Sequence, residues 1–248
     1  MAQSSLSSIS LIAAQDLLVD NATQQQVLGC YAETADGRGF RYVKMGGTSA
    51  VPGKLYVAPA FSQANNSPVG GLAVSAAAAI GATSVTIGTS TTNTLNSLAG
   101  GYLVTDVTPG QGQIYRIKGN TATVSATGMV ITLDDPLIVA LTTASTVVVT
   151  VSPYNGVIVS PGGASTGIPV GVATYVITNA QFGWIQTHGP SVVLSGVATS
   201  LSLPGVPVCP SASTAGSVIV STAILPTIGW IMHLFTATEY GLVFLLID

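Results

Sequence analysis

The sequence has few charged side chains. Only 6 of its 248 residues are Lys or Arg and 9 are Asp or Glu, so 6% of the chain is charged, against about 25% in an average soluble domain. The basic residues all lie between Arg38 and Lys118, and residues 136–238 carry no charge. A net charge of −3 offers no basic patch for nucleic-acid phosphates. Because surface charge normally opposes association, we expect much of the C-terminal half to lie against partner subunits.

Long hydrophobic runs are also missing, although 48% of the residues are hydrophobic and the mean hydropathy is +0.61. A transmembrane helix needs about 20 consecutive apolar residues. The most apolar stretch, residues 224–235, is interrupted by Pro226, Thr227, Gly229 and His233. Disordered chains are rich in charge and poor in β-branched residues, and this chain is the opposite. The composition therefore excludes membrane-spanning helices, coiled coils and general disorder.

Histidine and cysteine are scarce, with two of each. A metal site needs several converging ligands, and the positions of His188, His233, Cys30 and Cys209 show no ligand spacing. We interpret the histidines as surface or interface residues and the cysteines as small buried hydrophobic residues. A disulfide between the two cysteines stays open, since it needs Cα atoms within about 7 Å. We expect no metal and no cofactor.

Patterns typical of catalysis are absent as well. The sequence contains no G-x-S-x-G elbow between a strand and a helix. Asp134 and Asp135 are neighbours, which would point to opposite faces of a strand and suits a turn before Pro136 better than a paired-carboxylate site. The fragment Gly110-Gln111-Gly112-Gln113 lacks the third glycine and the helix of a dinucleotide-binding loop, and we interpret it as a hairpin turn. We expect the chain not to be an enzyme.

What the sequence does contain is a series of short strand patterns. Runs rich in Val, Ile and Thr alternate with Gly, Pro and Asn turn residues, which is typical of β-sandwiches and barrels. We expect an all-β protein with two small β-barrel or β-sandwich modules and an extended N-terminal arm. The expected strands are residues 27–31, 40–44, 54–57, 84–87, 102–105, 114–117, 129–133, 145–151, 156–159, 173–178, 184–186, 192–194, 218–221, 230–235 and 242–247. Residues 76–80 and 137–141 could form short helical turns. Residues 11–26 could also form one, and an extended arm is the equal alternative there.

The order of these patterns suggests four segments. Residues 1–26 form a Ser-rich arm, 27–68 a β-hairpin region and linker, 69–155 a middle β module, and 156–248 a C-terminal β module. Chain termini stay mobile unless something holds them. We therefore expect the arm to be disordered in the free protein and ordered on a partner.

Two aromatic segments are candidate interface sites, because interfaces favour Trp and Tyr as anchors. Phe40 and Tyr42 flank Arg41 on an expected strand, so Arg41 should face away from the two rings. It could reach a neighbouring subunit, or it could be a solvated surface charge. Trp184 is interpreted as either a core residue or an interface anchor. His188 lies at an expected strand end, where it could form a pH-sensitive contact.

Several segments resemble decoration (cement or auxiliary head) proteins of tailed bacteriophages. These are residues 36–42 with 52–55, residues 100–117 with 134–137, residues 171–189, and residues 215–216 with the apolar strand 242–247. The resemblance spans most of residues 27–248. It implies a virion protein on the capsid surface that binds the major capsid protein and clamps its subunits, often as a homotrimer. It transfers no individual binding residue.

A phage fibre, spike or host-adhesion module that binds a glycan or receptor is the alternative, since Ser, Thr and Asn are abundant. Residues 1–10 contain no Lys or Arg and no apolar core of signal-peptide length. We therefore expect synthesis in the host cytoplasm before assembly into the virion.

Overall fold

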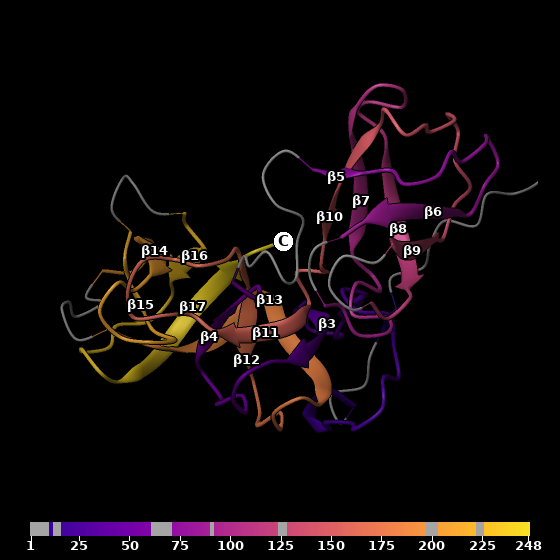
Figure 1. The fold of residues 1–248 in the computed structure, drawn as a ribbon. Helices are drawn as coiled ribbons and strands as arrows, with labels where there is room; N and C mark the ends of the chain where they lie inside the picture. The colour runs from indigo at the N-terminus through magenta and orange to yellow at the C-terminus, as the bar shows by residue number, and fades with distance from the viewer. Residues whose placement is uncertain are drawn as a thin grey trace, which may run out of the picture. The chain divides into compact units, whose positions relative to one another are not determined.

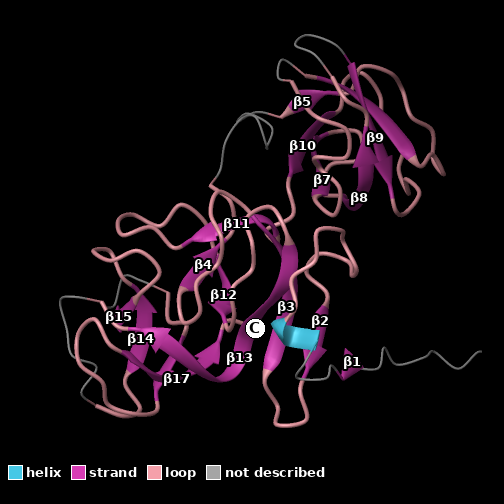
Figure 2. Cartoon of the chain, turned by 90° about the horizontal axis from the view of Figure 1, so that it is seen from below, coloured by secondary structure: helices cyan, strands magenta, loops and turns pink. Residues whose placement is uncertain are grey.

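The chain folds into two compact units whose regular secondary structure is almost entirely β-strand. The computed structural model describes residues 10–11, 16–60, 71–89, 92–123, 128–196, 203–221 and 226–248. Unit 1 comprises Met1–Ala60 and Pro153–Asp248, and unit 2 comprises Phe61–Ser152. In these described ranges the one helical element is a 3₁₀ turn, η1 (Asp16–Leu18), which Figure 2 shows among the strands. The predicted all-β class is confirmed.

Unit 2 is a closed six-stranded barrel (Figure 1). Its strands are β5 (Leu72–Ala73), β6 (Ser84–Gly88), β7 (Tyr102–Val107), β8 (Ile114–Asn120), β9 (Gly128–Leu133) and β10 (Thr146–Thr150). They pair in the order β5-β10-β7-β8-β9-β6, and a bridge from Val74 to Ile87 joins the two edges. Alternate residues of each strand point inward, so Leu103, Ile117 and Ile131 are buried in a core of this unit alone.

Three turn predictions in unit 2 can be compared with the structure. Gly110 and Gly112 both have positive φ in the β7–β8 hairpin, so the hairpin interpretation of this fragment is confirmed. Asp134 follows β9 in a bend and forms an ion pair with Arg116 at 3.4 Å, as a turn residue rather than a paired acid. Neither segment considered for a helical turn is helical: residues 76–80 and 137–141 consist of bends and irregular backbone joined by an Ala78–Leu141 bridge.

The first half of unit 1 is a closed five-stranded barrel. Its strands are β3 (Gly39–Met45), β4 (Leu55–Val57), β11 (Asn155–Val159), β12 (Pro169–Ala173) and β13 (Phe182–Leu194). The ring runs β3-β11-β4-β12-β13 and closes because β13 also pairs with β3. Val43, Tyr56 and Ile185 are wholly or almost wholly buried inside it. The barrel therefore combines residues from both ends of the chain.

The second half of unit 1 is a nearly closed sheet around another core. The last part of β13 pairs with β17 (Tyr240–Leu246), followed by β16 (Gly229–Ile231), β14 (Pro207–Pro210) and β15 (Val218–Val220). A bridge from Ser195 to Val218 connects the end of β13 to the far edge. Val193, Val243 and Leu245 point into the core.

Strand β13 connects the two halves of unit 1. The sequence predicts two strands here, residues 184–186 and 192–194, with a turn at Gly189-Pro190, but this is wrong because one strand of 13 residues runs through. Its register with β3 shifts between Gln186 and His188, and Gly189 has a φ of 82°. Bulges bend a strand and tolerate Gly and Pro, which lets β13 leave one sheet and enter the other.

Other strand boundaries also differ from the prediction. Residues 27–31 are expected to be extended, but Gly29 has positive φ and the strand β2 is Tyr31–Glu33. Residues 173–178 are expected as a strand, but β12 precedes them and ends at Ala173. Strand β14, Pro207–Pro210, is missed because proline usually argues against a strand. Local sequence patterns therefore find most strands, but they misplace strand ends and miss a strand that contains proline.

The two units do not have the same boundaries as the four segments expected from the sequence. Residues 27–60 and 156–248 share the strands of unit 1, and the middle unit is inserted between them. Most of the expected linker, residues 61–68, lies outside the described residues.

The described part of the N-terminal arm packs on unit 1. Strand β1 (Ser10–Leu11) pairs in parallel with β2, and Asn21 exchanges two backbone hydrogen bonds of 2.9 Å with Phe182. Residues 1–9 and 12–15 lie outside the described residues. The expectation of an arm disordered in the free protein is therefore wrong for residues 16–26, because backbone and side-chain hydrogen bonds hold them against β3 and β13.

Candidate functional site

The candidate aromatic residues gather on the outer face of the five-stranded barrel. Residues 40 and 42 of β3 point to the same side, where Tyr42 lies against the rings of Phe182 and Trp184, with centroid distances of 6.2 and 5.1 Å. Leu17 of η1 covers this cluster. Phe40 and Tyr42 are almost wholly buried and Trp184 is 7% exposed. These rings thus contact residues of their own chain, and the core interpretation of Trp184 agrees with its burial.

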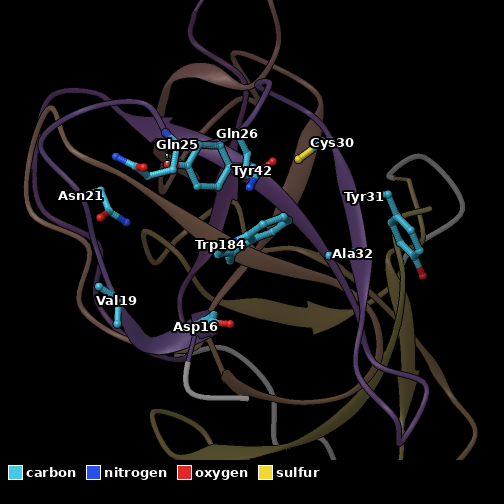
Figure 3. Close-up of a pocket in the computed structure, with 10 residues that line it drawn as sticks. All are labelled: Asp16, Val19, Asn21, Gln25, Gln26, Cys30, Tyr31, Ala32, Tyr42 and Trp184. Carbon is cyan, nitrogen blue, oxygen red and sulfur yellow. Dashed lines mark hydrogen bonds between the residues drawn. The ribbon is translucent and has the colours of Figure 1, made fainter. Parts of the chain in front are cut away.

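A pocket of about 480 Å³ lies beside this cluster, between the arm and the barrel (Figure 3). Figure 3 shows Gln25 and Gln26 near the ring of Tyr42, Trp184 below it, and Asp16 and Val19 on the opposite side. The lining residues are Asp16, Val19, Asn21, Gln25, Gln26, Cys30, Tyr31, Ala32, Tyr42 and Trp184. Two of them, Tyr42 and Trp184, are candidates from the sequence, whereas the polar ones come from the Ser-rich arm and its continuation.

Hydrogen bonds position the polar wall of this pocket. The Tyr175 hydroxyl donates to the carbonyl of Val19 at 2.7 Å, and the backbone N–H of Thr178 donates to the Asp20 carboxylate at 2.9 Å. The N–H of Gln25 donates to the Tyr42 hydroxyl at 3.1 Å. Gly183 is needed for this arrangement, because a Cβ there would overlap the Tyr175 hydroxyl. The arm is thereby held at three points along the pocket.

The pocket is electrically neutral apart from Asp16. Burial raises the pKa of the Cys30 thiol, against the opposing effect of the Arg41 charge. Burial likewise raises the pKa of the Tyr31 and Tyr42 hydroxyls, so all three groups are uncharged at neutral pH. Cys30 is a free thiol, as is the buried Cys209. The disulfide that the sequence left open does not form in this structure.

Arg41 faces away from Phe40 and Tyr42, as strand alternation predicts, but it binds groups of its own chain. Its Nε and Nη2 donate to the two carboxylate oxygens of Asp248 at 3.0 and 3.2 Å, and Nη1 donates to the carbonyl of Gly29 at 2.7 Å. The guanidinium also lies 5.2 Å from the ring centroid of Tyr31. Partial burial lowers the pKa of Arg41, but the hydrogen bonds and charge of Asp248 outweigh burial and raise it overall. The Arg41 guanidinium is therefore bound within its own chain, and its contact with a neighbouring subunit stays a prediction.

We expect the Arg41–Asp248 pair to stabilise unit 1 by about 1 kcal/mol, since it is bidentate and only about a quarter exposed. In a double-mutant cycle with Arg41→Gln and Asp248→Asn, urea unfolding should give a coupling energy of that size. The coupling should shrink in 1 M NaCl because salt screens partly exposed charges. Additive single-variant effects would contradict the interaction.

A different surface of unit 1 presents apolar side chains outward. Along β13 and β17 the inward positions alternate with outward ones, and the outward residues are paired across the two strands: His188 with Leu246, Pro190 with Phe244, Val192 with Leu242. Trp230 of β16 lies opposite Phe244. We call these seven residues the outward face. None of them is acidic, lysine or arginine.

The outward face is apolar and accessible. Val192 is 53% exposed and Trp230 38% exposed. His188 is half-buried and its ring meets Phe244 edge-on at 5.4 Å, so this candidate belongs to the outward face. A second pocket of about 510 Å³ opens beside it, lined in part by Pro190, Val192 and Leu242.

The sequence analysis did not predict the outward face, although one strand pattern pointed to it. Residues 242–246 are five consecutive apolar residues, and such a strand is apolar on both faces. Val243 and Leu245 fill the core, which leaves Leu242, Phe244 and Leu246 outside. The pairing with β13 and β16 that extends this stripe into a surface comes only from the tertiary structure.

Neither metal chemistry nor membrane insertion through helices finds support in the described ranges. They contain no group of three or more His, Cys, Asp or Glu side chains able to hold a metal ion. They also contain no helix of the length and apolarity needed to cross a membrane. Comparison with known proteins gives no match to a family model, a curated protein or a solved structure.

Proposed function

We propose that this chain is a structural virion protein that decorates and stabilises a phage capsid by binding the major capsid protein, and that it does so as a homotrimer. The observation that carries the proposal is the outward face of unit 1, which exposes Val192 and Trp230 on a sheet without charged residues. Exposed apolar patches of this kind mark association surfaces, and permanent interfaces are the more hydrophobic class.

The closed barrels suit such a role. A barrel has no long free edge to pair with other chains, so association is directed to side-chain surfaces. In a three-fold ring, the outward face of one copy contacts a different surface of the next copy. The resemblance to capsid decoration proteins agrees with this assembly. The basic residues lie outside the seven residues of the outward face, although Arg38 lines the pocket beside it.

Quantitative mass spectrometry of purified particles of the virus that encodes the chain tests the proposal. A decoration protein should be present in hundreds of copies per particle. The free protein should have a mass in solution of about 75 kDa, three times the 24.9 kDa of one chain. A count of a few to tens of copies would favour the fibre or adhesion alternative, and absence from purified capsids would contradict both.

A further inference from the structure

The pocket beside Tyr42 and Trp184 has the size and rigidity of a ligand site. Its volume of about 480 Å³ lies in the usual range of small-molecule pockets, roughly 300 to 1,000 Å³. One wall is the barrel surface, and the other is the arm segment held by Tyr175, Thr178 and Tyr42. The pocket is thus formed in the isolated chain and needs no partner to complete it.

Several polar groups in the pocket lack a hydrogen-bond partner among the described residues. They are the side chains of Asp16, Asn21 and Gln26, and the indole N–H of Trp184. The Trp184 side chain is mostly buried, but its indole nitrogen is not among the enclosed side-chain atoms without a partner. Asp16 and Gln26 are exposed, so these polar groups are open to solvent and to an occupant of the pocket. Together these groups offer two amides, one carboxylate and one N–H donor to an occupant.

The chemistry of the lining selects the class of ligand. No Lys or Arg lines the pocket, so phosphates and carboxylates find no counter-charge. A purely apolar ligand would leave the amides, the carboxylate and the indole N–H unsatisfied, which costs free energy for each group. A ligand with several hydroxyls matches better, because each hydroxyl both donates and accepts, as the Asn and Gln amides do.

Apolar contacts complete the match. The rings of Tyr42 and Trp184 and the side chain of Val19 lie among the polar groups (Figure 3). A pyranose ring presents C–H groups beside its hydroxyls, so it needs both kinds of surface. We propose that this pocket binds a neutral hexopyranose, either as a free sugar or as the terminal residue of a glycan. This inference goes beyond the proposed capsid role and does not depend on it.

The two tryptophans make binding measurable at this one site. In a Trp230→Phe background Trp184 is the only tryptophan, and its fluorescence reports the pocket. The probes are the methyl glycosides of glucose, galactose, mannose and N-acetylglucosamine. We expect at least one to give a saturable change with a Kd on the order of 1 mM, as suits a small ligand with few contacts.

Variants of the arm locate the site. Asn21→Leu and Gln26→Leu should each weaken the binding at least about tenfold, which corresponds to the loss of a good hydrogen bond. Gln111→Leu is the matched control, since Gln111 is an exposed amide of unit 2, and it should leave the Kd unchanged. Circular dichroism confirms that each variant is folded.

Cys30 provides a second, independent readout. It lines the pocket, whereas Cys209 is wholly buried. A maleimide should therefore label Cys30 in the native protein, and a saturating sugar should slow this labelling several-fold. Cys30→Ser should abolish the native-state labelling.

The two sources of the sugar are distinguished by chain length. An oligosaccharide with the same terminal residue that binds at least about tenfold tighter than the methyl glycoside indicates a glycan end, and equal affinity indicates a free sugar. Two results would overturn the inference: no saturable response to any of the four glycosides up to about 100 mM, or a response to inorganic phosphate alone. These assays use the purified chain, whereas the proposed capsid role is tested by counting copies in purified particles. Either test can therefore fail while the other succeeds.

Discussion

Trp230→Asp is expected to convert the proposed trimer to a monomer. Trp230 lies on the outward face opposite Phe244 and is partly exposed, so the proposed interface would bury its indole. Tryptophan is enriched among residues that dominate interface energy. Replacing it by a carboxylate would bury an unpaired charge, which costs several kcal/mol for each of the three contacts. Light scattering after size exclusion should show one chain mass at micromolar concentration.

The matched control is Ile138→Asp in unit 2. Ile138 is 64% exposed, so the same charge placed there should leave the trimer mass unchanged. Val192→Asp, at another exposed position of the outward face, should behave like Trp230→Asp. Far-ultraviolet circular dichroism verifies that each variant retains its strands. A trimer that survives both substitutions on the outward face would exclude it as the subunit contact.

Trp184→Ala is expected to destabilise unit 1 by about 3–5 kcal/mol, the usual cost of removing a large buried aromatic side chain. The indole packs edge-on against Tyr42 and closes the cluster beneath η1. That loss is a large fraction of the 5–15 kcal/mol that typically stabilises a domain. Guanidinium unfolding followed by tryptophan fluorescence measures it, because both tryptophans lie in unit 1 and Trp230 still reports in the variant.

Unit 2 should not share this loss, because its buried core is formed by its own residues alone. Leu103→Ala is the matched variant there. Leu103 is fully buried, and its removal should lower the stability of unit 2 by about 2–5 kcal/mol while the fluorescence transition stays in place. If each variant shifts the unfolding transitions of unit 1 and unit 2 by the same amount, the two units unfold as one.

Only part of the candidate pocket could be predicted from the sequence. Tyr42 and Trp184 stood out because aromatic residues are rare in this chain. Asn21 and Gln26 did not, since amides in a Ser-rich arm are ordinary surface residues. Their common site arises because Phe182 pairs with Asn21 and the Tyr42 hydroxyl accepts a hydrogen bond from Gln25. Such contacts join residues far apart in the chain, and no local pattern encodes them.

Arg41 illustrates the same limit. Strand alternation correctly predicted that it faces away from Phe40 and Tyr42. The partner could not be predicted, because Asp248 is 207 positions away and reaches Arg41 only after β17 has joined the sheet through β13.

The scarcity of charge and the abundance of short β-branched runs indicated by themselves that this protein is all-β. Alternation within β3 also indicated which of its side chains share a face, because the two faces of a strand differ by a fixed period of two. Only the tertiary structure decided that β3 and β4 share one ring with β11, β12 and β13, that β13 runs through Gly189 and Pro190, and that the outward face is continuous. Barrel closure and strand pairing depend on hydrogen bonds between distant segments, and those are selected by the packing of the whole core rather than by any local stretch of sequence.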